Sequence, residues 1–313
     1  MLLNNQWAGS CWYYLRFADP KNQEALLGKD AASWLPVDLY VGGQEHAVLH
    51  LLYARFWHKV LFDIGVVDHD EPFTKLVHQG MILGSDGEKM SKSRGNVINP
   101  DDVVLEFGAD ALRLYEMFMG PLEAVKPWQT SQLSGVVRFR DRVYNLIKRK
   151  ISDREPETGL LREINKTIKK VTLDIEELGF NTAISNLMIF SNKLSSIEGE
   201  LPRQAVETLV LLVSPFAPHL AEEAWQQLGH SKSLAHEAWP KYDEALCVDT
   251  TAVVAVQVNG KVRAKLEMDV SLPEAEAYAT AIQQSSVTKY TDGLEVKKIV
   301  YVPGRIINIV VGK

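Results

Sequence analysis

The period of the hydrophobic pattern changes twice along the chain, and this constrains the fold more than any other feature of the sequence. Between residues 129 and 229, apolar residues recur at helical spacing, with interruptions at Pro156, Gly179 and Gly199–Pro202. The pattern predicts four long helices, near residues 129–151, 160–178, 182–197 and 203–229. Short interruptions between long helices favour an antiparallel bundle. We assign residues 126–240 to this helical domain.

Strands and helices alternate before the bundle. The pattern predicts, in order, a strand at Val37–Val41, a helix from Glu45 to about Ile64, a strand at Leu76–Leu83 and helices that begin at Pro100 and near Gly108. This alternation is typical of an α/β domain with a parallel sheet. We assign residues 1–125 to it.

The last sixty or so residues have a third pattern. Val253–Glu267 alternates between apolar and polar residues around Asn259-Gly260, which is a strong signal for a two-residue hairpin turn. A helix at Pro273–Tyr290 and strands at Val296–Val302 and Ile306–Val311 complete a ββαββ module. We assign residues 250–313 to this module and residues 230–250 to a linker. The predicted fold class is therefore α/β, then all-α, then α+β.

Composition excludes several classes of protein. No apolar run reaches the roughly 18 residues that a membrane-spanning helix needs, so we expect no membrane partner. The sequence has two cysteines, too few for a disulfide framework. This low number fits a reducing, cytoplasmic location. A net charge of −6 counts against a protein that coats nucleic acid non-specifically, but it allows local basic patches.

The segment Ser85–Asn96, SDGEKMSKSRGN, carries the most informative chemistry. It holds Lys89 and Lys92 between two glycines, Gly87 and Gly95. A solvated charged turn is the commonest fate of such a run. However, two lysines three residues apart can also converge on one polyanion, because ammonium groups are mobile point charges for phosphate. Such charges supply much of the catalysis in phosphoryl transfer.

A second segment, Asp38–Phe56, places two glycines between a strand and a helix, which lets backbone approach a nucleotide closely. Glu45 and His46 follow the glycines, and His50 lies one helical turn further on. A satisfied core histidine is an alternative for His50. Zinc binding by His46 and His50 is another, but Ala47 stands where the zincin pattern needs Glu. We expect no metal site.

Several motifs together resemble the class I aminoacyl-tRNA synthetases, and among them the leucyl type of bacteria. They are GGQEHAVLHLLYARF from Gly42, QGMIL from Gln79, EKMSKSRGNVINPDD from Glu88, FGADALRLYEMFMGP from Phe107, SPFAPHLAEEAW from Ser214 and VQVNGKVRAKL from Val256. Isoleucyl and valyl enzymes share the lysine loop and remain the nearest alternative. The resemblance implies the C-terminal half of a doubly wound nucleotide-binding sheet, a four-helix anticodon-binding bundle and a ββαββ tRNA-binding module.

The resemblance also implies an activity. Leucine and ATP, with Mg²⁺, would form leucyl-adenylate, and leucine would then pass to tRNA(Leu). Lys89 and Lys92 would be catalytic, and His50 would face the leucine pocket. The implied ATP-binding residues are Gly42, Gly43, Glu45, His46, Met81, Ile82, Lys89, Met90, Ser91, Lys92 and Ser93.

Contacts with tRNA are implied at two places. Arg138, Arg142 and Lys148 lie on the first bundle helix. Lys261, Arg263 and Lys265 alternate on one strand of the terminal module, so we expect them to share a face.

The sequence lacks two further features of this family, namely the His-x-Gly-His signature and the inserted editing domain. We therefore expect the N-terminal half of the synthetase to be a missing partner, whether the chain is a fragment or one subunit of a split enzyme. We expect no activation of leucine by this chain alone. A tRNA-binding accessory protein without catalysis, and a different nucleotidyl transferase, are the rival functions.

Overall fold

The computed structural model describes residues 9–248 and 251–312. The chain divides into two compact units, residues 1–160 with 167–240 and residues 161–166 with 241–313. Residues 1–8 of the predicted first domain, residues 249–250 at the end of the predicted linker, and residue 313 of the predicted last module lie outside the described residues. Within the described part, none of the helices is long and apolar enough to cross a membrane.

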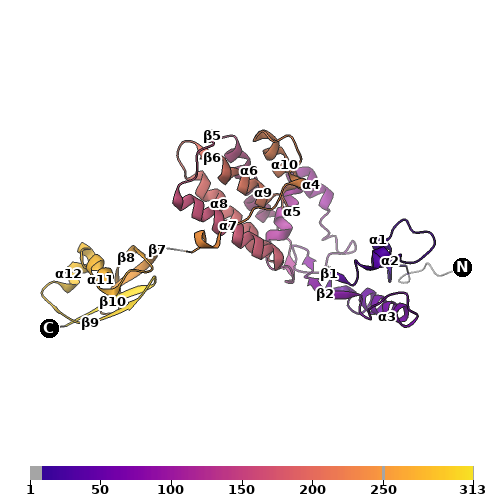
Figure 1. Ribbon diagram of the computed structural model, residues 1–313, viewed down its shortest axis with the longest axis horizontal. Coiled ribbons are helices and arrows are strands. Elements are labelled where there is room, and N and C mark those ends of the chain that lie inside the picture. The colour runs from indigo at the N-terminus through magenta and orange to yellow at the C-terminus, as the bar shows by residue number, and fades with distance from the viewer. Residues whose placement is uncertain (1–8, 249–250, 313) are drawn as a thin grey trace. The chain divides into compact units, whose positions relative to one another are not determined.

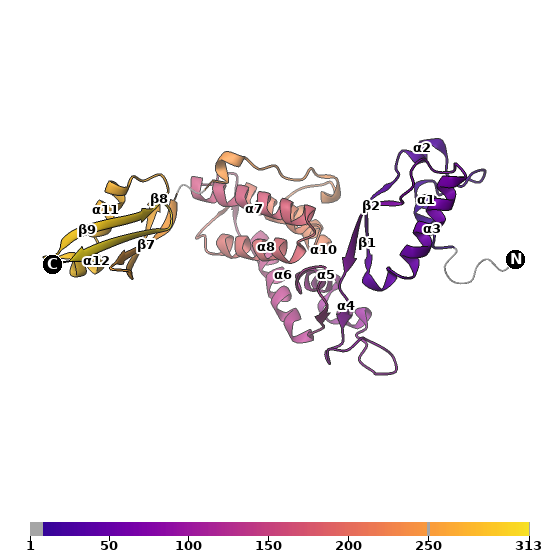
Figure 2. The same cartoon turned by 90° about the horizontal axis from the view of Figure 1, so that it is seen from below.

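The first unit begins with an α/β segment built around a parallel strand pair (Figures 1 and 2). Its elements are α1 Tyr13–Ala18, α2 Lys29–Ala32, β1 Val37–Gly43, the 3₁₀ turn η1 Gln44–His46, α3 His50–Asp63 and β2 Phe73–Gln79. β1 and β2 pair in parallel, with Gly42 opposite His78, and α3 makes the crossover between them. The parallel pairing confirms the expected α/β character of this segment.

Two predicted elements of this segment have different bounds. The helix expected from Glu45 begins at His50, because Leu49 has a non-helical backbone (φ −114°, ψ −96°) that separates η1 from α3. The strand expected at Leu76–Leu83 is interrupted. The N–H of Gly80 donates to the carbonyl of Leu122 at 2.8 Å, so the chain leaves β1 at this point. β3 Ile82–Leu83 then pairs in parallel with β4 Lys126–Pro127.

The lysine segment follows β3 and leads into α4 Pro100–Phe107 and α5 Ala109–Phe118. The predicted start of α4 is confirmed, since the side chain of Asn99 accepts a hydrogen bond from the N–H of Asp101 and Pro100 occupies the first turn.

The helical region contains one helix more than predicted. Its elements are η2 Thr130–Gln132, α6 Leu133–Ile147, β5 Ile151–Ser152, α7 Thr158–Glu176, α8 Phe180–Ser195, β6 Leu201–Pro202, α9 Arg203–Val213 and α10 Pro218–Gln227. The expected helix 203–229 is wrong. It divides at Ser214–Ala217, because Pro218 has no N–H to donate and Ala217 has a non-helical backbone (φ −133°, ψ 70°). Residues 133–227 thus form five α-helices, whose core includes Val136, Phe139, Leu187 and Leu209, all almost fully buried.

The second unit contains a four-stranded sheet with two short helices. Two 3₁₀ turns precede the sheet: η3 Leu234–His236 belongs to the first unit and η4 Glu244–Leu246 to the second. The second unit continues with β7 Thr251–Val258, β8 Lys261–Asp269, α11 Glu274–Ile282, α12 Ser285–Thr291, β9 Glu295–Val302 and β10 Ile306–Gly312. The strand order is β8-β7-β10-β9, with β7 and β10 parallel. The single helix expected at Pro273–Tyr290 is wrong, because the extended backbone of Gln284 divides it. The module is ββααββ.

Candidate functional site

A cavity of about 350 Å³ lies at the carboxyl ends of β1 and β2. Parallel sheets commonly bind ligands at this edge. Its lining includes Tyr13, Tyr40, Gly42, Gly43, His46 and His50. The structure therefore brings four of the predicted site residues together.

A chain of hydrogen bonds crosses one wall of the cavity. Nε2 of His50 lies 2.8 Å from the hydroxyl of Tyr40, which lies 2.5 Å from the hydroxyl of Tyr13. The Tyr40 ring also stacks on Phe73, with ring centroids 3.9 Å apart. Burial, and to a lesser extent the neighbouring His46, lowers the pKa of His50. Burial raises the pKa of Tyr40. The His50 and Tyr40 rings of this wall are therefore uncharged at neutral pH.

Sequence reasoning missed Tyr13, Tyr40 and His78, which also lines the cavity. A signal for Tyr40 was present, because it lies two residues before Gly42 on the same strand and so shares its face. Tyr13 is 27 residues from Tyr40, and no local pattern links the two.

Gly43 makes room for Glu45. A Cβ atom at Gly43 would collide with the Glu45 carboxylate, whereas a Cβ at Gly42 would meet nothing within 4 Å. The backbone of Gly42 is therefore open to the cavity, with no side chain packed against it. Glu45 is exposed beside it on η1.

The histidine pair is not arranged as a metal centre. The rings of His46 and His50 have centroids 6.3 Å apart and are nearly perpendicular, and Nε2 of His50 is bound to Tyr40. Across the described ranges, no group of three or more His, Cys, Asp or Glu side chains could hold a metal ion.

The lysine loop, residues 84–96, joins β3 to α4. The two glycines that flank the lysines have a positive φ, 77° at Gly87 and 67° at Gly95, which favours glycine. Lys89 bridges back to Leu83, and the side chains of Lys89 and Lys92 are exposed. Neither ammonium forms an ion pair with any described residue. Two mobile positive charges are therefore presented to solvent.

The backbone of Met81 has a partner in this structure. Its carbonyl accepts a hydrogen bond from the N–H of Lys126 at 3.1 Å. Met81 and Ile82 thus lie at the start of the β3–β4 pair, and their predicted contact with adenine stays a prediction.

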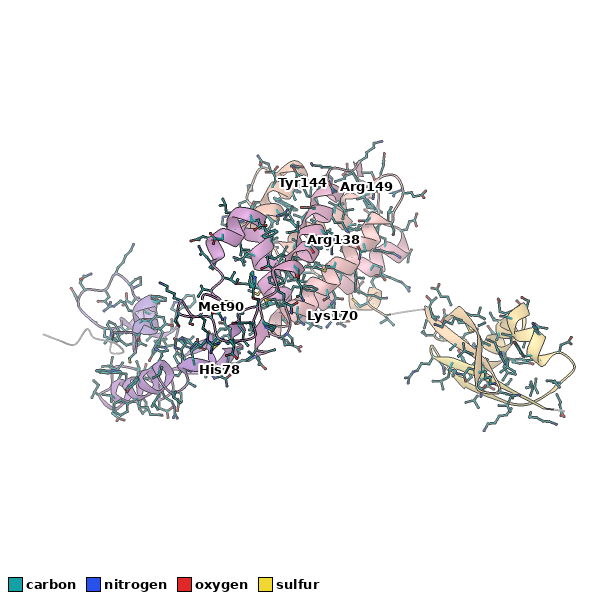
Figure 3. The ribbon with its side chains drawn as sticks, turned by 180° about the vertical axis from the view of Figure 1, so that it is seen from behind. His78, Met90, Arg138, Tyr144, Arg149 and Lys170 are labelled. Carbon is teal, nitrogen blue, oxygen red and sulfur yellow. The ribbon has the colours of Figure 1, made fainter. Side chains whose placement is uncertain are left out.

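Basic residues of α6 border a groove of about 450 Å³, whose lining includes Arg138, Arg142, Asn145 and Arg149. Arg149 is committed to the fold, because its guanidinium donates to the carbonyls of Leu194, Ile197 and Gly199. Figure 3 labels Arg138 and Arg149 on the helical region. Arg138 is exposed and Arg142 half-buried.

Lys148 is not part of this groove lining. Its ammonium lies 4.0 Å above the centre of the Tyr144 ring, in a cation–π contact.

The three basic residues of β8 do not behave alike. The guanidinium of Arg263 lies 3.5 Å above the Tyr290 ring, next to a register shift in the β7–β8 pair at Val256/Gln257. Lys261 and Lys265 are exposed. The bulge disturbs the alternation on which the expected common face depended.

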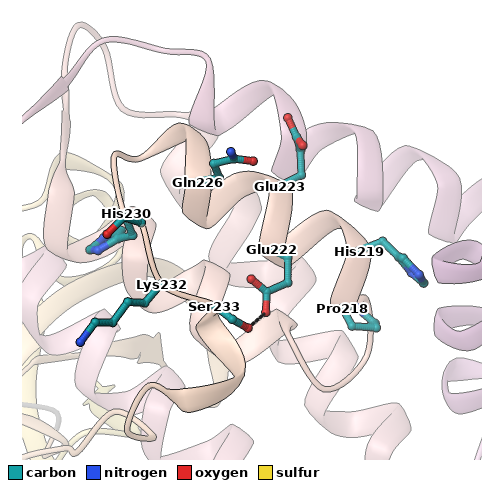
Figure 4. Close-up of a pocket in the computed structure, with 9 residues that line it drawn as sticks. Pro218, His219, Glu222, Glu223, Gln226, His230, Lys232 and Ser233 are labelled. Atoms are coloured by element: carbon teal, nitrogen blue, oxygen red, sulfur yellow. Dashed lines mark hydrogen bonds between the residues drawn. The ribbon is translucent and has the colours of Figure 1, made fainter.

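A hollow of about 480 Å³ along α10 was not predicted as a site, and three of its polar residues form contacts within the fold (Figure 4). Glu222 accepts a hydrogen bond from Ser233, and Nε2 of His230 lies 2.9 Å from Glu207. His230 also stacks on Trp225, with ring centroids 3.6 Å apart. These contacts hold the end of α10, and we assign no ligand to this hollow.

Comparison with known proteins agrees with this geometry. Residues 23–126 match the family of class I tRNA synthetases for isoleucine, leucine, methionine and valine, and residues 157–279 match the anticodon-binding domain of tRNA ligases. A methionyl-tRNA synthetase of Mycobacterium tuberculosis shares the fold over 73% of this chain and 51% of its own, at 18% identity and a TM-score of 0.56. The α/β segment and the helical region thus have the fold of a class I aminoacyl-tRNA synthetase.

Relatives with higher identity narrow the class. The chain is 61% identical to a leucine–tRNA ligase of Sorangium cellulosum and 51% identical to one of Chlorobaculum tepidum, over 98% of its own length in both cases. A LeuRS of Agrobacterium radiobacter, solved as a ternary complex with tRNA and LeuAMS, matches 98% of this chain at 36% identity and a TM-score of 0.77. The chain belongs to the leucine–tRNA ligase family, and the similarity lies in the C-terminal part of those enzymes.

The match covers only part of each relative. The chain spans 36% and 39% of the two ligases and 42% of the solved LeuRS chain. This share is consistent with the expected absence of an N-terminal half.

Proposed function

We propose that this chain supplies the phosphate-binding loop and the tRNA-binding part of a leucine–tRNA ligase. Such an enzyme forms leucyl-adenylate from ATP and leucine and then transfers leucine to tRNA(Leu). The observation that carries the proposal is the pair of exposed lysines, Lys89 and Lys92, which form no ion pair within the described residues. They lie on a loop between two glycines of positive φ, in the same unit as the glycine cavity. A cytoplasmic location follows from this activity.

In this proposal the cavity at Gly42 and Gly43 holds the adenosine side of the adenylate, with Glu45 and His46 beside it. His50, with Tyr40, faces the leucine side chain, since burial keeps both rings uncharged. Met81 and Ile82 meet the adenine edge, and Met90, Ser91 and Ser93 belong to the loop that closes over the phosphates.

Lys89 and Lys92 act on the departing pyrophosphate. The leucine carboxylate attacks the α-phosphorus, and negative charge builds on the leaving phosphates. Charges placed where this build-up occurs favour the transition state over the ground state, so the lysines affect rate more than binding. Mg²⁺ would accompany the ATP phosphates, and we assign it no protein ligand.

The helical region, residues 126–240, binds the tRNA near its anticodon stem in this proposal. Arg138 and Arg142 are better candidates than Lys148, because they border an open groove whereas Lys148 packs on Tyr144. In the terminal module, residues 250–313, Lys261 and Lys265 are better candidates than Arg263, which packs on Tyr290.

The remaining partner is the part of a leucine–tRNA ligase that carries His-x-Gly-His. An apolar stripe on α3 supports this, since Leu52 and Phe56 lie one helical turn apart and are 60% and 67% exposed. Exposed apolar patches commonly mark an interaction surface. The first half of a doubly wound nucleotide-binding sheet is the partner that would cover this stripe.

An aminoacylation assay tests the proposal. The chain would be combined with a separately produced N-terminal part of a leucine–tRNA ligase, with tRNA(Leu), and with leucine, isoleucine or valine. We expect charging with leucine alone. Charging with isoleucine or valine would favour the nearest alternative enzymes. Binding of tRNA without any charging would favour the accessory protein.

A further inference from the structure

Asn96 ties together three parts of the lysine loop. Its amide nitrogen lies 3.1 and 3.0 Å from the two carboxylate oxygens of Asp86, and 3.4 Å from the carbonyl of Lys89. Its amide oxygen accepts the N–H of Ser91 at 2.9 Å. One half-buried side chain thus joins the turn before the lysines to the backbone on both sides of Met90.

Asp86 completes this arrangement from the other side. Its Oδ1 atom accepts the N–H of Glu88 at 3.1 Å. The hydrogen bond from Asn96, followed by that from Glu88, lowers the pKa of Asp86, which is therefore an anion at neutral pH. Hydrogen bonds to ionised acceptors are stronger than those between neutral groups.

Gly84 provides the space for the pair. A Cβ atom at this position would lie 2.6 Å from Oδ1 of Asp86 and 2.8 Å from Nδ2 of Asn96. The N–H of Gly84 also donates to the carbonyl of Glu88 at 2.8 Å, which closes the turn. Three residues of the sequence are therefore adapted to a single contact, the Asp86–Asn96 clasp.

We propose that Asn96 is a positioning residue for Lys89 and Lys92, and that it acts through the Asp86–Asn96 clasp. The clasp fixes the backbone at Lys89 and Ser91, from which the two lysine side chains extend. Because both side chains extend from this fixed backbone, one pyrophosphate can meet the two ammonium groups together. This inference rests on the proposed role of the loop in binding phosphates.

A set of matched substitutions tests the clasp itself. Asn96→Ala removes both interactions of the amide, and Asn96→Asp places a second carboxylate against Asp86. The double variant Asp86→Asn with Asn96→Asp restores a donor and an acceptor in the reverse order. It also keeps acceptors for the N–H groups of Glu88 and Ser91. Ser85→Ala, a change at an exposed neighbour, is the control.

The first readout is hydrogen exchange at the Ser91 amide. We expect exchange to accelerate about tenfold in Asn96→Ala, the effect of losing one such hydrogen bond. Exchange should also accelerate in Asn96→Asp, because repulsion between the two carboxylates moves the new one away from the Ser91 amide. Exchange should return toward the original rate in the double variant and stay unchanged in the control. Equal exchange rates in all variants, or a double variant no slower than Asn96→Asp, would overturn the clasp.

The second readout is the binding of magnesium pyrophosphate. It is measured by how far pyrophosphate protects Lys89 and Lys92 from acetylation. We expect Asn96→Ala to weaken pyrophosphate binding about tenfold, the same factor as the change in the exchange rate of the Ser91 amide. Unchanged binding with accelerated exchange would refute the positioning role. If the original chain bound no pyrophosphate, the proposed phosphate site would fail, while the exchange readout would still decide the clasp.

Discussion

At the scale of single residues, Gly80 determines where the chain leaves the first strand pair. A Cβ atom there would collide with the backbone of Ala124 and press on Glu123. We predict that Gly80→Ala lowers the free energy of unfolding by about 1–3 kcal/mol, the usual cost of overpacking. Chemical denaturation would measure this change.

Gly135→Ala is the matched control for this prediction, because the same added methyl group meets nothing within 4 Å. Gly135 lies inside α6, where alanine is the better helix former by up to about 1 kcal/mol. The two variants should therefore move stability in opposite directions. A Gly80→Ala chain as stable as the original would contradict the close approach.

His58 gives the first unit a dependence on pH. The side chain is fully buried, with Nδ1 2.8 Å from the Tyr14 hydroxyl and Nε2 2.9 Å from the carbonyl of His69. Burial lowers its pKa from the ordinary value of 6.5, although the hydrogen bond to His69 and the charge of Glu71 oppose the shift, while the charge of Lys59 and the His69 ring add to it. The unfolded chain therefore takes up a proton more readily than the folded one.

The sign of this dependence follows directly. The stability that His58 contributes is complete above pH 6.5 and is lost as the pH falls below that value. Thermal unfolding of the chain between pH 7.5 and 5.5 should show a falling midpoint. The slope should be smaller in a His58→Asn variant, which cannot take up the proton. An equal slope in both chains would show that another group is responsible.

Much of the site at this scale could be predicted from local sequence. Gly42, His46 and His50 were expected at a strand–helix junction, and the cavity contains all three. The partners that set their chemistry could not be predicted, because Tyr13 and Tyr40 reach His50 through the fold rather than through neighbouring positions.

At the scale of elements, Asp110 joins the helix after the lysine loop to the break between α9 and α10. Its carboxylate, 8% exposed, accepts the N–H of Leu220 at 2.7 Å and lies 2.9 Å from Nδ1 of His219. Arg113, one turn along α5, donates to the carbonyls of Pro215 and Phe216. α5 thus caps the start of α10 and binds the turn before it.

We predict that Asp110→Ala destabilises the first unit by about 2 kcal/mol, because it leaves buried N–H groups of α10 without their acceptor. Asp141→Ala is a suitable control, since that carboxylate is 55% exposed and pairs with its sequence neighbour Arg140. Such surface pairs contribute about 0–1 kcal/mol. Equal denaturation midpoints for the two variants would contradict the proposed cap.

The helices that were predicted incorrectly share a physical cause. Residues 203–229 and 273–290 keep a helical period across an interruption of four and two residues, respectively, so periodicity alone merges two helices into one. Pro215 and Pro218 were the available signal in the first case. In the second, Gln283-Gln284 carries no local signal for the break, and packing of α12 on the sheet decides it.

At the scale of the whole molecule, the two units and the span of the relatives support one account. The chain holds the lysine loop, a glycine cavity and an exposed apolar stripe on α3, and it matches somewhat more than a third of each leucine ligase. In the proposed function, each of these features belongs to one side of a catalytic site. The central claim is that leucine activation needs both sides.

Leucine-dependent exchange between ATP and labelled pyrophosphate tests this claim most directly. We predict no exchange by this chain alone and exchange when the N-terminal part of a leucine–tRNA ligase is added. Lys92→Ala should abolish the restored exchange, whereas Lys21→Ala, at an exposed lysine outside the loop, should leave it intact. Exchange by the chain alone, or restored exchange that does not depend on Lys92, would contradict the account.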